Sequence, residues 1–393
     1  MEFQSRQVKS MAKEIPDDIS FTILSKLPLK SLNRFTCVHK SWAGLLQNPY
    51  FMTIFRANFL SKHHSYYNDT SLLLQQTPHL IDYLMGCGRP PYLLSGDKFQ
   101  NRVKLDWPLP FQVDDRFIVI LGSGIHGTFC LNQSKKFVLW NPATEEFRII
   151  PPSPLDSPPD LGVMITTPHG FGYDPVRDDF KVIRELVTFP DYTAFEDDWP
   201  IAPDPSIFWE IYSLRSNSWR KLDAHMPIIV ERPAKCTDTY VNGVCHWLGI
   251  VDLHGDEEHL ASFNLSNEVF LTTPLPFDLG DRSLQKCLVV LNGSIAVISE
   301  SAETTFHISI LGELGVKESW TKLFTIGPLP WVGFPIGVGN KGDVFLRKEE
   351  KGELALFDLS SQMLEDIVTK EQLDSHRIII YKESPLQIGQ TEY

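Results

Sequence analysis

The stretch VLWNPATEEFRIIP, residues 138–151, decides the fold of most of this chain. An apolar run ends in a polar turn at Asn141 to Glu145, and a second run opens with the aromatic residue Phe147. Short apolar runs bounded by Asn, Pro and polar residues are typical of β-strands joined by a turn. The unit returns in residues 211–222, 262–270, 308–323 and 354–364.

The spacing of these units indicates a repeat architecture. The residues that open the second strand are Phe147, Trp219, Phe270, Trp320 and Met363, in steps of 72, 51, 50 and 43 residues. A period near 50 residues with several short strands per repeat predicts the blades of a β-propeller. Because these Trp residues recur with the blades, we expect them to pack structurally rather than to stack on a ligand.

A second set of hairpins lies between the repeated units. Asn242-Gly243, Asn292-Gly293 and Asn340-Lys341-Gly342 each fall within apolar runs, and Asn-Gly supplies the positive φ angles of a tight turn. Five units are visible, and six or seven blades result if residues 70–115 contribute. We expect about six blades, closed by the strand 377–381 beside an early blade.

Two acidic segments interrupt the pattern. Residues 190–205 hold no Lys or Arg, and a second segment runs from Asp252 to His259. Such segments are commonly only solvated, but loops at one rim of a propeller often bind partners. They are therefore our candidates for binding a basic substrate, through Asp191, Glu196, Asp197, Asp198, Asp256, Glu257 and Glu258.

The first 60 residues have helical periodicity instead. A first helix begins near Pro16, carries the stripe Ile19, Ile23 and Leu27, and ends at Pro28. Residues 29–38 predict a second helix, residues 38–46 a third, and residues 51–59 one more. A unit this small rarely folds without a metal, a disulfide or a partner, so its apolar surface hints at a protein interface.

Composition excludes several classes of protein. The chain has 393 residues, of which 42% are hydrophobic, enough for large cores. Its formal net charge of −13 argues against nucleic acid or an anionic membrane as partner. No apolar leader and no run of 18 apolar residues occurs, and the six Cys form no C-x-x-C pair. We therefore expect buried thiols in a reducing compartment, the cytoplasm or nucleus.

The N-terminal pattern, EIPDDISFTILSKLPLKSLNRFTCVHKSW at residues 14–42, resembles the F-box. The match is continuous, and departures are mild: Ile15 stands where Leu is commoner, and His39 fills a variable position. The resemblance implies docking on a Skp-type adaptor, which joins a cullin and a RING protein. Adaptor-binding residues would be Ile15, Pro16, Ile19, Ile23, Leu24, Leu27, Pro28, Leu32, Arg34, Val38 and Trp42.

The body is similar to the F-box-associated domain of plant F-box proteins, including S-locus and kelch-like members. The similarity lies in residues 139–144, 170–175 with 179–182, 212–214 with 218–220, and 242–243 with 246–247. It implies a non-catalytic subunit of a Skp–cullin–F-box (SCF) ubiquitin ligase, whose body binds an unidentified protein for ubiquitination. The effect would be proximity between that protein and the charged E2 enzyme. A non-degradative interaction scaffold is the alternative.

Catalysis and metal binding find no support in the residues. His254, Asp256 and His259 match no standard metal spacing. Cys245 and His246 are neighbours on an expected strand, so they point to opposite faces and cannot act as a nucleophile and base. A propeller hydrolase would need converging carboxylates, which the apolar and Gly-rich inner strands do not offer. We expect no catalytic residue, cofactor or metal.

The domain organisation follows from these patterns. We expect a disordered N-terminus at residues 1–13 and an F-box helical domain at residues 14–60. Residues 61–115 would be a linker with a candidate divergent first blade, and residues 116–386 a kelch-type β-propeller. A disordered tail would occupy residues 387–393, so the fold class is a small three-helix domain followed by an all-β domain.

Overall fold

The computed structural model divides into two compact units, residues 1–61 and residues 62–393. It describes residues 17–38, 42, 44–61, 70–76, 90–96, 99, 101–111, 118–156, 164–188, 206–229, 238–251, 257–276, 285–301, 304–329, 331–339, 342–348, 353–367, 376–384 and 388. Each unit is taken by itself below.

The first unit is helical. It contains α1 (Asp17–Leu24), α2 (Leu29–Thr36), the short 3-10 helix η2 (Leu45–Gln47) and α3 (Pro49–Ser61). The third helix expected over residues 38–46 is wrong in its described part, where only the 3-10 turn occurs. Asn48 explains the break, because its side chain accepts the Phe51 N–H at 3.1 Å and so caps α3 instead. Among the described residues, no helix is long and apolar enough to cross a membrane.

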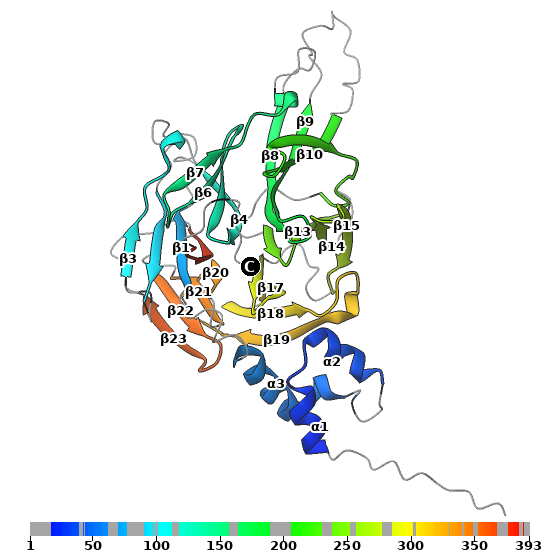
Figure 1. The fold of residues 1–393 in the computed structure, drawn as a ribbon. Coiled ribbons are helices and arrows are strands. Elements are labelled where there is room, and N and C mark those ends of the chain that lie inside the picture. Colours follow the sequence, from blue (N-terminus) through cyan, green and yellow to red (C-terminus); the bar gives the residue numbers. More distant parts are fainter. Residues whose placement is uncertain are drawn as a thin grey trace, which may run out of the picture. The chain divides into compact units, whose positions relative to one another are not determined.

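The second unit is a propeller of six four-stranded antiparallel blades, which Figure 1 shows arranged around a centre. The expectation of about six blades is confirmed. The first four blades in chain order are β24-β1-β2-β3, β4-β5-β6-β7, β8-β9-β10-β11 and β12-β13-β14-β15, followed by β16-β17-β18-β19 and β20-β21-β22-β23.

The strand bounds place every blade in the sequence. They are β1 (Thr70–Gln76), β2 (Tyr92–Ser95), β3 (Asn101–Lys104), β4 (Val119–Ile125), β5 (Thr128–Gln133), β6 (Lys136–Asn141), β7 (Glu146–Ile149), β8 (Met164–Asp174), β9 (Asp179–Thr188), β10 (Ser206–Ser213), β11 (Ser218–Leu222), β12 (Asp238–Val241), β13 (Val244–Ile250), β14 (Glu258–Asn264), β15 (Val269–Pro274), β16 (Lys286–Leu291), β17 (Ser294–Ser301), β18 (Thr305–Leu311), β19 (Trp320–Ile326), β20 (Gly337–Val338), β21 (Asp343–Arg347), β22 (Leu354–Asp358), β23 (Met363–Ile367) and β24 (His376–Lys382). Short 3-10 turns at Leu109–Phe111, Pro154–Asp156 and Lys317–Ser319 join or follow them.

The last strand closes the ring. β24 pairs with β1 from Thr70 opposite Lys382 to Gln76 opposite His376. This confirms that the C-terminal strand lies beside an early blade, and that residues 70–104 supply the other strands of that blade. Gln75 then donates to the Ile118 carbonyl at 2.8 Å, which ties the closed blade to the next one.

The five repeated units form the outer hairpins of their blades. Tyr212 lies opposite Trp219, and Phe263 lies opposite Phe270. The tryptophans also bridge blades, because the Trp219 indole donates to the Pro151 carbonyl at 2.8 Å and the Trp320 indole to the Pro274 carbonyl at 3.2 Å. Each therefore packs against the end of the preceding blade, as expected for a structural role.

The turns follow from their residue types. Asn242 and Gly243 have φ angles of 47° and 83°, and Asn292 and Gly293 have 54° and 73°. These are the left-handed conformations that Asn-Gly hairpin turns require. At the outer hairpins a side-chain oxygen binds the following backbone N–H groups, as Asn264 does for Ser266 and Asn267. The turn at Asn340-Lys341 lies outside the described residues.

The core lies between neighbouring blades and reaches the C-terminus. One cluster packs Phe137, Leu139 and Phe171 against Ile388, which is 2% exposed. The Ile388 N–H also donates to the Glu146 carboxylate at 2.9 Å. The expected disordered tail at 387–393 is thus corrected at this position, because an apolar side chain there covers an otherwise open blade surface.

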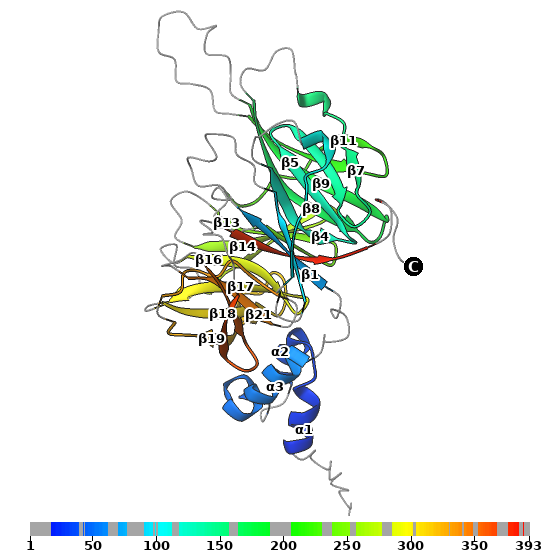
Figure 2. The ribbon, with the colours of Figure 1, turned by 90° about the vertical axis from the view of Figure 1, so that its left-hand side faces the viewer.

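The two sides of the propeller differ in their connections. We call the connection face the side at which the innermost strands β4, β8, β12, β16, β20 and β24 begin. The second strand of each blade ends there, since it is antiparallel to the first. Ile229, before β12, pairs with Ile250 at the end of β13, and Val332, before β20, pairs with Lys348. Figure 2 shows the propeller from the side.

Candidate functional surfaces

The helical unit has a filled core of its own. Leu29, Leu32, Leu45, Phe51 and Phe55 are at most 5% exposed. Asn58 on α3 donates to the hydroxyl of buried Ser25 at 2.9 Å, which fixes α3 against the end of α1. The apolar side chains that remain outside this core are therefore available for a partner.

The structure separates the predicted adaptor-binding residues into two groups. Ile19, Ile23 and Val38 are 47%, 55% and 71% exposed, whereas Leu24 and Leu32 are 3% and 0% exposed. The exposed side chains can contact another protein directly, but the two leucines hold the unit together. Of the others, Leu27 and Trp42 are half-buried, Pro28 and Arg34 are exposed, and Ile15 and Pro16 lie outside the described residues.

Helical geometry explains the division. Ile19 and Ile23 are one turn apart on α1 and share its exposed side, while Ser20 and Leu24 share the buried side. On α2, Phe35 is 38% exposed, and its ring lies 5.9 Å from the Trp42 ring in an edge-to-face contact. An aromatic pair thus adjoins the region where α2 ends.

The predicted acidic substrate-binding residues lie mostly outside the described residues. This holds for Asp191, Glu196, Asp197, Asp198 and Asp256. Glu257 has a side chain 71% exposed, whereas Glu258 pairs with nearly buried Lys286 at 2.5 Å. The charge of Glu258 is therefore balanced by Lys286 within the propeller. Substrate binding by the remaining acids stays a prediction.

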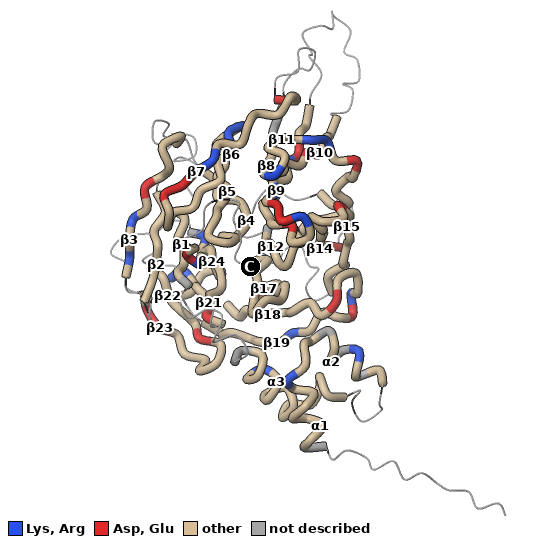
Figure 3. The backbone as a smooth tube through the Cα atoms, in the orientation of Figure 1, with Lys and Arg blue, Asp and Glu red and all other residues tan. Residues whose placement is uncertain are grey.

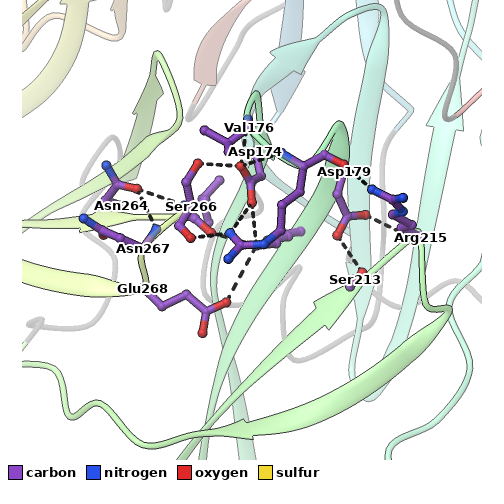
Figure 4. A network of polar contacts seen from close by, with 12 residues as sticks. Asp174, Val176, Asp179, Ser213, Arg215, Asn264, Ser266, Asn267 and Glu268 are labelled. Carbon is purple, nitrogen blue, oxygen red and sulfur yellow. Dashed lines mark hydrogen bonds and ion pairs between the residues drawn. The ribbon is translucent and has the colours of Figure 1, made fainter.

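A buried polar network joins the third and fourth blades, and Figure 4 shows it from close by. Asp174, fully buried at the end of β8, accepts from Lys181 at 2.8 Å and from the backbone of Val176 at 3.0 Å. Ser266, from the β14–β15 turn, donates to the same carboxylate. Lys181 in turn donates to the Leu265 carbonyl at 2.7 Å.

The electrostatics of this network are those of a structural site. Burial alone would raise the pKa of Asp174, but hydrogen bonds from Lys181, Ser266 and Arg177 outweigh it and lower that pKa well below its usual range. The carboxylate is therefore negatively charged, and both of its oxygens already accept hydrogen bonds from neighbouring groups. It fixes the turns of two blades and is not a general acid or base.

A second buried network lies between the second and third blades. Arg184, with no exposed surface, contacts Glu210 at 2.6 Å and Asp156 at 2.8 Å. Its guanidinium also lies 4.3 Å from the centre of the Trp219 ring. Each charged group has opposite partners, so this network also holds blades together.

Cys245 and His246 occur as expected on one strand and do not meet. The Cys245 thiol faces the Phe171 carbonyl at 3.8 Å, and His246 contacts the Ser262 hydroxyl at 2.8 Å. Burial lowers the pKa of His246 to about 3, so the ring is neutral and a poor base. Within the described ranges, no group of three His, Cys, Asp or Glu side chains is placed to hold a metal ion.

A small cavity of about 50 Å³ lies among the innermost strands. Ser123, Thr239 and Arg377 are its polar lining residues, beside Gly122 and Gly337 and the apolar residues of β16 and β24. Arg377 donates to the Ile120 and Gly122 carbonyls at 3.1 and 3.3 Å. Its guanidinium thus bridges the last strand to the second blade, and the cavity is too small for a drug-sized ligand.

One exposed residue escaped the sequence patterns. Trp331 is 67% exposed, whereas the tryptophans of the repeated units, Trp219 and Trp320, are 8% exposed. It lies in the Pro-rich connection between β19 and β20 and in no repeated unit. The signal that marks it is the Gly-Pro-Leu-Pro sequence before it, which interrupts the strand pattern.

Comparisons with known proteins agree with both units. The F-box domain family matches residues 13–53, and the family described as F-box associated beta propeller domain matches residues 127–387. An F-box protein of Arabidopsis thaliana is 25% identical, with 82% of this chain and 76% of that protein covered. The F-box protein CPR1 of the same plant is 23% identical, covering 91% and 85%.

Two further comparisons complete these findings. An F-box/kelch-repeat protein of Arabidopsis thaliana is 23% identical over 88% of both chains. Among solved structures, a nidogen/laminin complex chain aligns with a TM-score of 0.44 and 11% identity, covering 80% of this chain and 99% of that chain. The two matched domains together indicate a general substrate-recognition role in an SCF-type ubiquitin ligase. With its F-box domain and a propeller match spanning most of the second unit, the chain belongs to the F-box proteins with an F-box associated β-propeller domain.

Proposed function

We propose that this chain is the substrate receptor of an SCF-type E3 ubiquitin ligase. Its F-box would bind a Skp-type adaptor, and through it a cullin and a RING protein. Its propeller would hold a target protein for ubiquitination and proteasomal degradation. The chain would act in the cytoplasm or nucleus and contribute no catalytic residue, because its effect is proximity.

One observation carries the adaptor assignment. Ile19, Ile23 and Val38 are exposed although the core of the helical unit is already filled by Leu32 and Phe51. Exposed apolar side chains on a unit this small indicate a surface that a partner covers. Half-buried Leu27 and Trp42 would complete this surface at its edge.

The adaptor test uses substitutions that spare the core. We expect Ile23→Glu with Val38→Glu to weaken retention by a Skp-type adaptor at least about tenfold, a loss of about 1.4 kcal/mol. Val269→Glu, at a 56% exposed position on β15, is the matched control and should bind normally. Hydrogen exchange across α3 should be the same in the Ile23→Glu, Val38→Glu protein and in Val269→Glu as in the unaltered chain.

Leu32→Asp serves a different purpose. Because Leu32 has no exposed surface, this substitution should unfold the helical unit and accelerate exchange in α3. Normal adaptor binding by the Ile23→Glu, Val38→Glu protein would overturn the assignment of the interface.

The receptor role needs a second measurement. The chain is reconstituted with adaptor, cullin, RING protein, E1, E2 and ubiquitin, and proteins bound to the propeller are examined for ubiquitin. Modification of a bound protein that requires the propeller supports the receptor. Adaptor binding with bound proteins left unmodified would instead support the non-degradative scaffold.

A further inference from the structure

The connection between β19 and β20 displays a single large aromatic side chain. Trp331 is 67% exposed and has a φ of 73°, in the left-handed region. A bulky residue other than Gly in that region is a genuine outlier. The left-handed conformation therefore strains the backbone at this position, because the Trp Cβ lies too close to the following carbonyl oxygen.

The exposure does not come from a loosely attached segment. The Leu329 N–H donates to the Thr304 carbonyl at 3.2 Å, and the Gly333 N–H donates to the Arg347 carbonyl at 2.7 Å. Val332 is 3% exposed and pairs with Lys348. Trp331 is therefore held between fixed points on two blades, with its indole turned outward.

Neither the strain nor the exposure helps the propeller to fold. Gly at position 331 would adopt the same φ without strain, and a polar residue would remove the exposed apolar area. Backbone outliers of this kind cluster at ligand clamps and binding sites. Rigid, central Trp residues are also enriched among the side chains that dominate protein interfaces.

We propose that Trp331 is the anchor on which the propeller holds its protein substrate, by packing against an apolar side chain in a segment flanked by basic residues. This inference rests on the proposed function and names the chemistry of the substrate. It places the contact on the connection face, because residues 327–336 join the end of β19 to the start of β20.

The immediate surroundings of Trp331 indicate that the substrate side chain packed against it is apolar. Leu329 and Phe334 are half-buried neighbours in the same connection, and the Phe334 ring packs edge-on against Phe306 at 5.9 Å. The nearby charges, Lys348 and Asp366, pair with each other at 2.5 Å. An apolar centre with a paired polar edge is the usual anatomy of a protein interface.

The charge of the whole chain indicates that the substrate residues on either side of that apolar side chain are basic. The chain carries −13 overall, and Figure 3 shows acidic and basic residues interspersed on the described blades. Among the described residues, Glu257 lies between the end of β13 and the start of β14 at the connection face, and its side chain is 71% exposed. Complementary charge on the substrate would speed and orient its docking.

The test uses the full chain bound to its adaptor and labelled synthetic peptides on a Gly-Ser background. One peptide has a Phe-Leu pair between Lys-Arg pairs. A second replaces Phe-Leu with Ser-Ser, and a third replaces the Lys-Arg pairs with Glu-Asp. We expect the first to bind at least about tenfold more tightly than either other peptide by fluorescence anisotropy.

Trp331→Gly should abolish that preference while the melting temperature stays the same or rises, since Gly relieves the left-handed strain. Trp331→Phe should keep most of the affinity. Leu271→Ala, at a 45% exposed position on β15, is the matched control and should bind as the unaltered chain does. A purely structural Trp331 would give the opposite result, with lost stability and retained preference.

Two results would overturn the inference. One is equal binding of the three peptides by the unaltered chain, and the other is an unchanged preference in Trp331→Gly. Either leaves adaptor binding intact, so it is distinguishable from failure of the receptor role, in which adaptor binding or ubiquitin transfer is lost.

Discussion

At the scale of single residues, His246 makes the propeller sensitive to mild acid. Its ring is 2% exposed on β13, and burial lowers its pKa to about 3. In the unfolded chain the pKa returns to about 6.5. Between these values only the unfolded chain binds the proton. The stability due to neutral His246 is therefore complete above pH 6.5 and is lost as the pH falls toward 3.

The expected loss can be measured. Between pH 7.5 and 5.5 the free energy of unfolding should fall by about 1.4 kcal/mol more in the unaltered chain than in His246→Gln. Gln preserves a partner for the Ser262 hydroxyl but has no proton to gain. Urea unfolding at the two pH values gives the comparison, and equal pH slopes in both proteins would contradict it.

At the scale of elements, β24 completes the first blade and the whole ring. β1 carries Leu72, Leu73 and Leu74, all fully buried, and β24 covers one edge of that strand along its length. A chain ending after residue 375 would leave this edge and its apolar side chains open, which favours aggregation. Ending the chain after residue 388 keeps β24 and the contact of Ile388.

We therefore expect the first truncation to be insoluble or to unfold without a cooperative transition. The second should unfold as the full chain does. Size-exclusion chromatography and thermal unfolding compare the two. A soluble, cooperatively folding chain that ends after residue 375 would mean that β24 does not close the propeller.

The same strand shows why sequence predicts some blades better than others. Units such as 138–151 and 211–222 are local, so apolar runs separated by a polar turn predict them directly. The first blade combines β1 to β3 with a strand from the other end of the chain, and the repeat period does not reveal that pairing. The expectation that residues 377–381 close the ring comes from the general architecture of propellers. Local sequence patterns predict where the strands lie but not which distant strand each of them pairs with.

For a related reason, local sequence patterns do not predict which apolar side chains are exposed. Ile19, Ile23, Leu24 and Leu32 are all apolar, so periodicity alone cannot tell core from interface on short helices that are apolar on more than one side. Sequence patterns do not single out Trp331, because it lies in no repeated unit and its positive φ is a property of the folded connection, in which Leu329 and Gly333 donate to the Thr304 and Arg347 carbonyls.

At the scale of the whole molecule, the two units should differ sharply in stability. The propeller buries interlocking cores between six blades, as between Phe137 and Trp219. The helical unit has only a small core around Leu32 and Phe51. Since small domains bury a smaller fraction of their surface, we expect calorimetry to show a lower-temperature transition for the helices and a separate one for the propeller.

Adaptor binding should then act on one transition alone. A partner that binds only the folded helices stabilises them by about 4 kcal/mol when present at 1,000 times its dissociation constant. The lower transition should move upward with adaptor concentration and the propeller transition should stay. Ile23→Glu with Val38→Glu should remove the shift, because those side chains are exposed and outside the helical core. A shift of both transitions together would mean that the units unfold as one cooperative body.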